Sequence, residues 1–138
     1  MKLDWDILRL ILEEAEHCEG SLPLVCTRAT YGSPHYKINL EEINYSFNDI
    51  CEHFLLLGDA DLAVVRNLGV SFDGPTGVVL DRLTMKGHEF LAAAENEVGW
   101  GKAKEIAKQV GGFTVQQLFN FLIGYVKAEV KKSTGIEV

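Results

Sequence analysis

The spacing of apolar residues predicts two amphipathic helices in the first half of the chain. From Trp5 to about His17 an apolar residue recurs every three or four positions, and Asp4 stands where an N-cap belongs. The same period recurs over 46–57, behind a capping residue at Ser46. Each predicted helix therefore has one apolar face that needs a core to cover it.

A β-hairpin is predicted after the second helix. Residues 62–65 and 78–80 are short apolar runs, and the Gly- and Pro-containing stretch 73–77 that precedes the second run is typical of a turn. Thr84 is then placed to cap another helix. Helix, hairpin and helix in this order are typical of the end of a winged-helix domain, in which the hairpin is the wing.

The C-terminal part of the chain is predicted to be helical. An amphipathic segment at 102–110 follows an interruption at 96–101. Thr114 and Gln117 have the spacing of a capping box, which predicts a last helix reaching about Lys132.

Residues 21–45 allow two interpretations. The runs at 24–27 and 36–38 are typical of short strands on either side of a turn. Asn39 and Glu42 have capping-box spacing instead, which favours a short helix. Both interpretations stay open.

Together these elements predict an α+β protein. Its core is a winged helix-turn-helix over residues 1–95, and a helical extension follows over 96–138. A chain of 138 residues is the size of one domain, so we expect the two parts to form one compact unit.

The chain is acidic, and its charge is unevenly distributed. The formal net charge is −7, with −4 over residues 1–20, −3 over 46–66 and +1 over 92–138. Strong DNA binders present a basic surface to the phosphates, and this distribution does not predict one.

A cytoplasmic location is expected. No apolar run reaches the roughly 18 residues of a membrane span, and the acidic start of the chain differs from a signal peptide. The chain has three cysteines, at Cys18, Cys26 and Cys51. Their odd number and wide spacing fit reduced thiols rather than a disulfide framework.

Several segments occur in the order and spacing of one known family. They are Met1–Arg9, Ile50–Leu62, Leu83–Leu91 and Trp100–Lys104. With them the chain resembles the domain of unknown function DUF2513, found in short proteins of bacteria and their phages. The resemblance spans most of the chain and implies a winged-helix-like fold, but it implies no activity.

Three positions after the second helix bear on this fold. The family tends to have Gly where this chain has Asp61 and an aromatic residue where it has Met85. Asp tolerates the left-handed conformation and Met fills an aromatic's space, so we expect the fold to be retained. Gly87 inside a predicted helix costs about 1 kcal/mol relative to Ala, so we expect another backbone to approach it closely.

The exposed face of helix 46–57 is the first candidate site. Asn48, Glu52 and Leu55 lie opposite its apolar stripe, and the helix contains no Lys or Arg. As a recognition helix it would offer Asn48 to an adenine, whereas Glu52 would repel phosphates. Alternatively, Glu52 and Leu55 belong to a face that binds a protein.

The predicted hairpin supplies the second candidate, Arg66 and Arg82. An arginine on a wing can reach a phosphate or a minor groove. The alternative is two solvated arginines at strand ends.

Catalytic and metal-binding patterns are missing from the sequence. There is no Gly-x-Ser-x-Gly elbow and no phosphate-binding loop. His53 and His88 are too few for a metal site, and His17, Cys18, Cys26 and His35 have no ligand spacing. We expect no enzymatic activity, no cofactor and no metal.

The predicted last helix has a wide apolar sector. It suits a homodimer interface and also suits packing against the first helix of its own chain. The sequence as a whole predicts a binding function. The first hypothesis is a small DNA-binding regulator of phage or mobile-element origin, and the alternative is a protein–protein interaction adaptor.

Overall fold

The structure is a computed structural model with two compact units, residues 1–87 and 88–138. It describes residues 3–17, 23–27, 46–72, 74–112 and 114–135. The elements in chain order are α1 (Trp5–His17), β1 (Leu24–Thr27), α2 (Phe47–Asp59), β2 (Ala63–Asn67), β3 (Val70–Ser71), β4 (Gly74–Pro75), β5 (Gly77–Leu83), α3 (Met85–Ala94), α4 (Glu97–Val110) and α5 (Val115–Thr134). The predicted α+β class is confirmed, as is the strand at 24–27, whereas the predictions for 36–38 and 39–42 lie outside the described residues.

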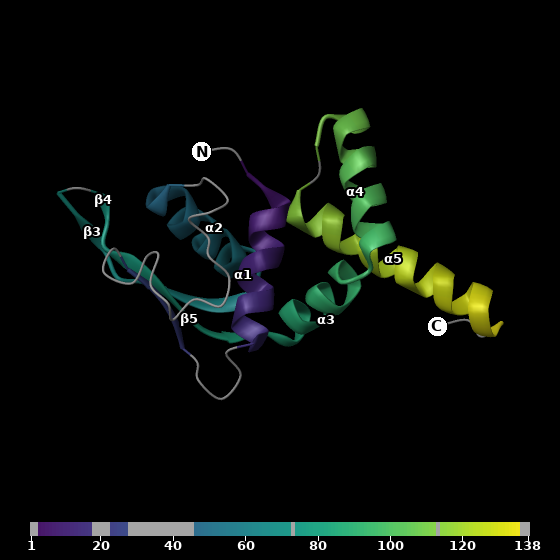
Figure 1. Cartoon of the computed structure of the whole chain (residues 1–138), viewed down its shortest axis with the longest axis horizontal. Coiled ribbons are helices and arrows are strands. Elements are labelled where there is room, and N and C mark those ends of the chain that lie inside the picture. The colour runs from purple at the N-terminus through teal and green to yellow at the C-terminus, as the bar shows by residue number, and fades with distance from the viewer. Residues whose placement is uncertain (1–2, 18–22, 28–45, 73, 113, 136–138) are drawn as a thin grey trace. The chain divides into compact units, whose positions relative to one another are not determined.

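The first unit is built on an antiparallel sheet in the order β1-β5-β2. Helices α1 and α2 contact each other, and both contact β5 (Figure 1). Leu24 pairs with Leu80 and Cys26 with Val78, and all four side chains are buried. This apolar face of the sheet and the buried faces of the two helices form the core.

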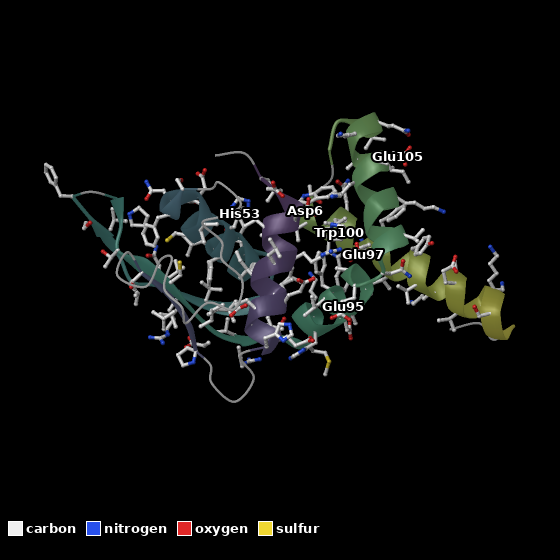
Figure 2. All side chains as sticks on the ribbon, in the orientation of Figure 1. Asp6, His53, Glu95, Glu97, Trp100 and Glu105 are labelled. Atoms are coloured by element: carbon white, nitrogen blue, oxygen red, sulfur yellow. The ribbon has the colours of Figure 1, made fainter. Side chains whose placement is uncertain are left out.

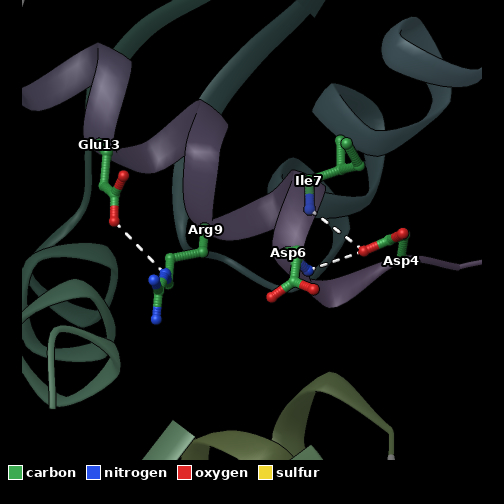
Figure 3. A network of polar contacts seen from close by, with 5 residues as sticks. All are labelled: Asp4, Asp6, Ile7, Arg9 and Glu13. Atoms are coloured by element: carbon green, nitrogen blue, oxygen red, sulfur yellow. Dashed lines mark hydrogen bonds and ion pairs between the residues drawn. The ribbon is translucent and has the colours of Figure 1, made fainter. Parts of the chain in front are cut away.

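Both predicted helix starts in this unit are confirmed. One carboxylate oxygen of Asp4 accepts from the backbone N–H groups of Asp6 and Ile7 at 2.9 and 3.4 Å (Figure 3). The hydroxyl of Ser46 accepts from the N–H of Asp49 at 3.1 Å. Each cap satisfies N–H groups that the first turn of a helix leaves without a backbone partner.

A buried histidine ties α2 to the start of α1. His53 is fully buried, and Figure 2 shows it on α2 beside α1. Its Nδ1 lies 2.7 Å from the carbonyl oxygen of Asp49, while its Nε2 accepts from the N–H of Asp4 at 2.9 Å. A neutral imidazole with its proton on Nδ1 satisfies both contacts.

The turn between α2 and β2 is locked to the start of α3. The N–H of Thr84 donates to the carbonyl of Leu62 at 3.1 Å, and the Thr84 hydroxyl donates to the carbonyl of Asp61. That hydroxyl also accepts from the N–H of Gly87, as expected of a cap. Asp61 has a φ of 60°, and a Cβ on Gly87 would overlap the Leu62 carbonyl oxygen. The expected close approach at Gly87 is therefore confirmed.

The second unit is helical, with α4 packed on α5. Phe90 meets Trp100 edge to face at 6.2 Å between ring centroids and stacks on Phe119 at 6.1 Å. Helix α5 begins with the predicted capping box of Thr114 and Gln117.

Helix α4 begins earlier than predicted, so the interruption expected at 96–101 covers only residues 95–96. The side chain of Asn96 accepts from the N–H of Gly99 at 2.8 Å and caps the helix there. Gly99 lies inside α4, and a side chain does not fit there because a Cβ would come within 2.8 Å of the Tyr125 ring. This glycine is a packing requirement and not a helix break.

Candidate interaction surface

The exposed side of α2 is acidic. Asn48, Glu52 and Asp59 are exposed at helical spacing, with Leu55 half-buried between them. We call these four residues the acidic face of α2. The helix holds no Lys or Arg, so nothing on it offsets the carboxylates of Glu52 and Asp59.

Arg66 forms a bidentate salt bridge within the hairpin. Its Nε and Nη2 donate to the two carboxylate oxygens of Asp81 at 2.7 and 2.9 Å. The hydrogen bond and the attraction between the opposite charges raise the pKa of Arg66, and the hydrogen bond lowers the pKa of Asp81. Both side chains are partly exposed, so the pair contributes little stability. Its main effect is that the Asp81 carboxylate offsets the positive charge of the Arg66 guanidinium.

Arg82 is the second predicted hairpin cation, and it is exposed. Its Nη1 donates to the carbonyl of Leu83 at a long 3.4 Å. The two arginines therefore do not act as one basic pair, because Asp81 offsets the charge of Arg66.

The net charge of the chain lies entirely in the first unit, which contains α2 and the hairpin. Residues 1–87 hold seven Lys and Arg against fourteen Asp and Glu, while residues 88–138 hold six of each. The first unit therefore carries −7 and the second carries none.

The tip of the hairpin holds three exposed apolar residues that the sequence pattern did not single out. Leu68, Val70 and Phe72 occupy alternate positions at or beside β3, and all three are exposed. We call them the apolar tip. Their alternation with Gly69 and Ser71 is visible in the sequence, but the segment lies between two predicted strands and looks like part of a turn.

The remaining candidate features are a metal site, a membrane span and a dimer interface. Among the residues that the structure describes, no three His, Cys, Asp or Glu side chains are placed to hold a metal ion, and Cys18 and His35 lie outside these residues. No helix in the described part of the chain is long and apolar enough to cross a membrane. The homodimer through the last helix stays a prediction.

Fold and surface define an α+β protein with a candidate binding surface made of one helix and one hairpin. The family model for the hypothetical proteins DUF2513 matches residues 2–114, and the chain belongs to this family. The resemblance drawn from the sequence is thereby confirmed, and α5 lies beyond the matched range. No curated protein and no solved structure matches the chain.

Proposed function

We propose that this chain is a non-catalytic protein-interaction adaptor of winged-helix architecture. Its binding surface is the acidic face of α2 together with the hairpin. The strand order β1-β5-β2 supports the architecture, because α2 directly precedes a hairpin whose second strand also pairs with β1.

The observation that carries the proposal is the charge of α2. A helix that reads DNA must bring its exposed face close to phosphates, where Lys and Arg release counterions and stabilise the complex. Here that face presents Glu52 and Asp59, and the helix has no Lys or Arg. Leu55, half-buried on the same face, adds apolar surface that a protein can cover.

A DNA-binding regulator of phage or mobile-element origin is the second candidate. It is favoured by the placement of α2 beside the hairpin and by two exposed polar side chains. These are Asn48, which could contact an adenine, and Arg82, which could contact a phosphate. If DNA is the ligand, Arg66→Ala with Arg82→Ala weakens binding and reduces its salt dependence.

One pair of measurements separates the two candidates. The adaptor hypothesis expects no change in fluorescence anisotropy of a random-sequence DNA duplex on addition of the protein, at low or at physiological salt. It also expects that a library of short random peptides yields binders, and that Glu52→Lys weakens them. Duplex binding that falls steeply with salt, combined with an empty peptide selection, would overturn the adaptor hypothesis.

A further inference from the structure

The apolar tip is the most exposed apolar feature among the residues that the structure describes. The exposures of Leu68, Val70 and Phe72 are 41%, 77% and 103%, so the Phe72 ring lies wholly in solvent. Single exposed apolar residues are common, but three within five residues of one hairpin give its tip a concentration of exposed apolar surface. Covering such side chains in a complex is favourable because apolar surface leaves water.

The described backbone beneath the apolar tip is hydrogen-bonded across the hairpin. The N–H of Leu68 donates to the carbonyl of Gly77 at 3.0 Å, and that of Thr76 donates to Gly69 at 2.9 Å. The Asn67 side chain accepts from the N–H of Gly69 at 2.9 Å. The Ser71 hydroxyl donates to the carbonyl of Gly74 at 3.1 Å. A surface already ordered in this way loses less conformational freedom on binding.

The net charge of the first unit indicates which kind of molecule the apolar tip can bind. A hairpin with an exposed Phe can wedge between base pairs or enter a lipid surface. Both DNA and anionic membranes repel a unit that carries −7. A basic partner is attracted instead. Strand β4 pairs with β3 and contacts α2, so the hairpin that carries the apolar tip lies next to the helix that bears the acidic face.

We propose that the apolar tip and the acidic face of α2 together bind a basic amphipathic segment of a partner protein. Phe72 is the hydrophobic anchor, and Glu52 and Asp59 attract the lysines and arginines of the segment. This inference rests on the proposed adaptor function and adds the chemistry of the partner. Such complexes form through a few buried aromatic contacts, with charge setting orientation and rate.

The test begins with a selection of short random peptides on the intact wild-type protein. The expected binders combine Lys or Arg with apolar residues, and their affinity falls as salt is raised. The Phe72→Ser variant is expected to bind the selected peptides at least about tenfold more weakly. Val70→Ser gives a second, independent reduction. Met85→Ser is the matched control, since Met85 is 75% exposed but lies outside the hairpin, and it leaves binding unchanged.

Three results would overturn the inference. Selected peptides that are acidic or uncharged would contradict a basic partner. Peptides that bind the Phe72→Ser variant as well as wild type would place the hydrophobic anchor elsewhere. In both cases the adaptor function stands. Phe72-dependent binding to phosphatidylserine vesicles or to duplex DNA would give the apolar tip a different occupant. A selection that yields no peptide removes this inference, and together with salt-sensitive duplex binding it removes the adaptor function as well. Equal thermal melting of Phe72→Ser and wild type excludes unfolding as the cause of any loss.

Discussion

Gly87 is the position where a single methyl group should do most damage to this fold. In Gly87→Ala the new Cβ would overlap the carbonyl oxygen of Leu62 and lie 2.9 Å from its carbonyl carbon. The Leu62 backbone cannot easily move away, because its N–H donates to Leu57 at 3.0 Å and its carbonyl accepts from Thr84 at 3.1 Å. The clash must therefore displace α3 from the turn that precedes β2.

The size of the effect follows from three contributions. Overpacking typically costs about 1–3 kcal/mol, and against a braced backbone the upper half of that range applies. Weakening the hydrogen bond from Thr84 to Leu62 costs about 0.5–1.5 kcal/mol. Replacing Gly by Ala within a helix returns about 1 kcal/mol. The net destabilisation is about 1.5–3.5 kcal/mol, which for a unit of this size lowers Tm by roughly 6–28 °C.

Two other helical glycines provide matched controls for the assay. At Gly58 a Cβ would meet only the Val65 side chain, at 3.3 Å, so Gly58→Ala should change the free energy of unfolding by less than about 0.5 kcal/mol. At Gly101 nothing lies within 4 Å, and Gly101→Ala should stabilise by about 0.5–1 kcal/mol. Thermal and urea unfolding followed by circular dichroism measure all three variants. If Gly87→Ala is as stable as wild type, the close approach of the Leu62 backbone is not what requires glycine there.

Three further predictions test the other contacts described above. His53→Leu should cost about 1–3 kcal/mol because the N–H of Asp4 loses its acceptor, while His53→Gln should cost less, and urea unfolding ranks the two. Thr114→Ala removes the cap of α5 and should cost about 1 kcal/mol, measured as a fall in Tm. The salt bridge lowers the pKa of Asp81, so the stability that its ionised form contributes is present above the ordinary Asp range. That stability is lost as the pH falls through the lowered pKa. An NMR titration of this carboxyl should return to the ordinary range in Arg66→Gln, and an unchanged titration would contradict the assigned cause.

Helix starts were predictable because each depends on a few neighbouring residues. Asp4, Ser46, Thr84 and Thr114 were all identified as caps, and each side chain accepts from a backbone N–H of the first turn. The close approach at Gly87 was predictable for a different reason. A glycine inside a predicted helix costs stability, which indicates that close packing requires it there.

The start of α4 was missed because two glycines resemble a break. Gly99 and Gly101 lower helix propensity by about 1 kcal/mol each, which favours a loop when neighbouring residues alone are considered. Gly99 is required by the Tyr125 ring, a contact between helices that are distant in sequence. Tertiary packing of this kind overrides propensity and leaves no local signal in the sequence.

The salt bridge of Arg66 could not be predicted from the sequence because it depends on one irregularity in the sheet. Val64 pairs with Arg82, and the register shifts by one residue before Val65 pairs with Leu80. Without that shift Arg66 would lie opposite Leu80, but with it Arg66 lies opposite Val79, and both of these residues are buried.

The irregularity has a direct consequence for function. Asp81 is the residue left over between the two pairs, and its carboxylate accepts both hydrogen bonds from Arg66. Beside this bulge the carboxylate of Asp81 offsets the charge of the Arg66 guanidinium. A hairpin evolved to grip phosphate would gain from keeping that charge available, since each phosphate contact adds to affinity. With Arg66 paired to Asp81, the apolar tip is the part of the hairpin that the proposed protein partner would contact.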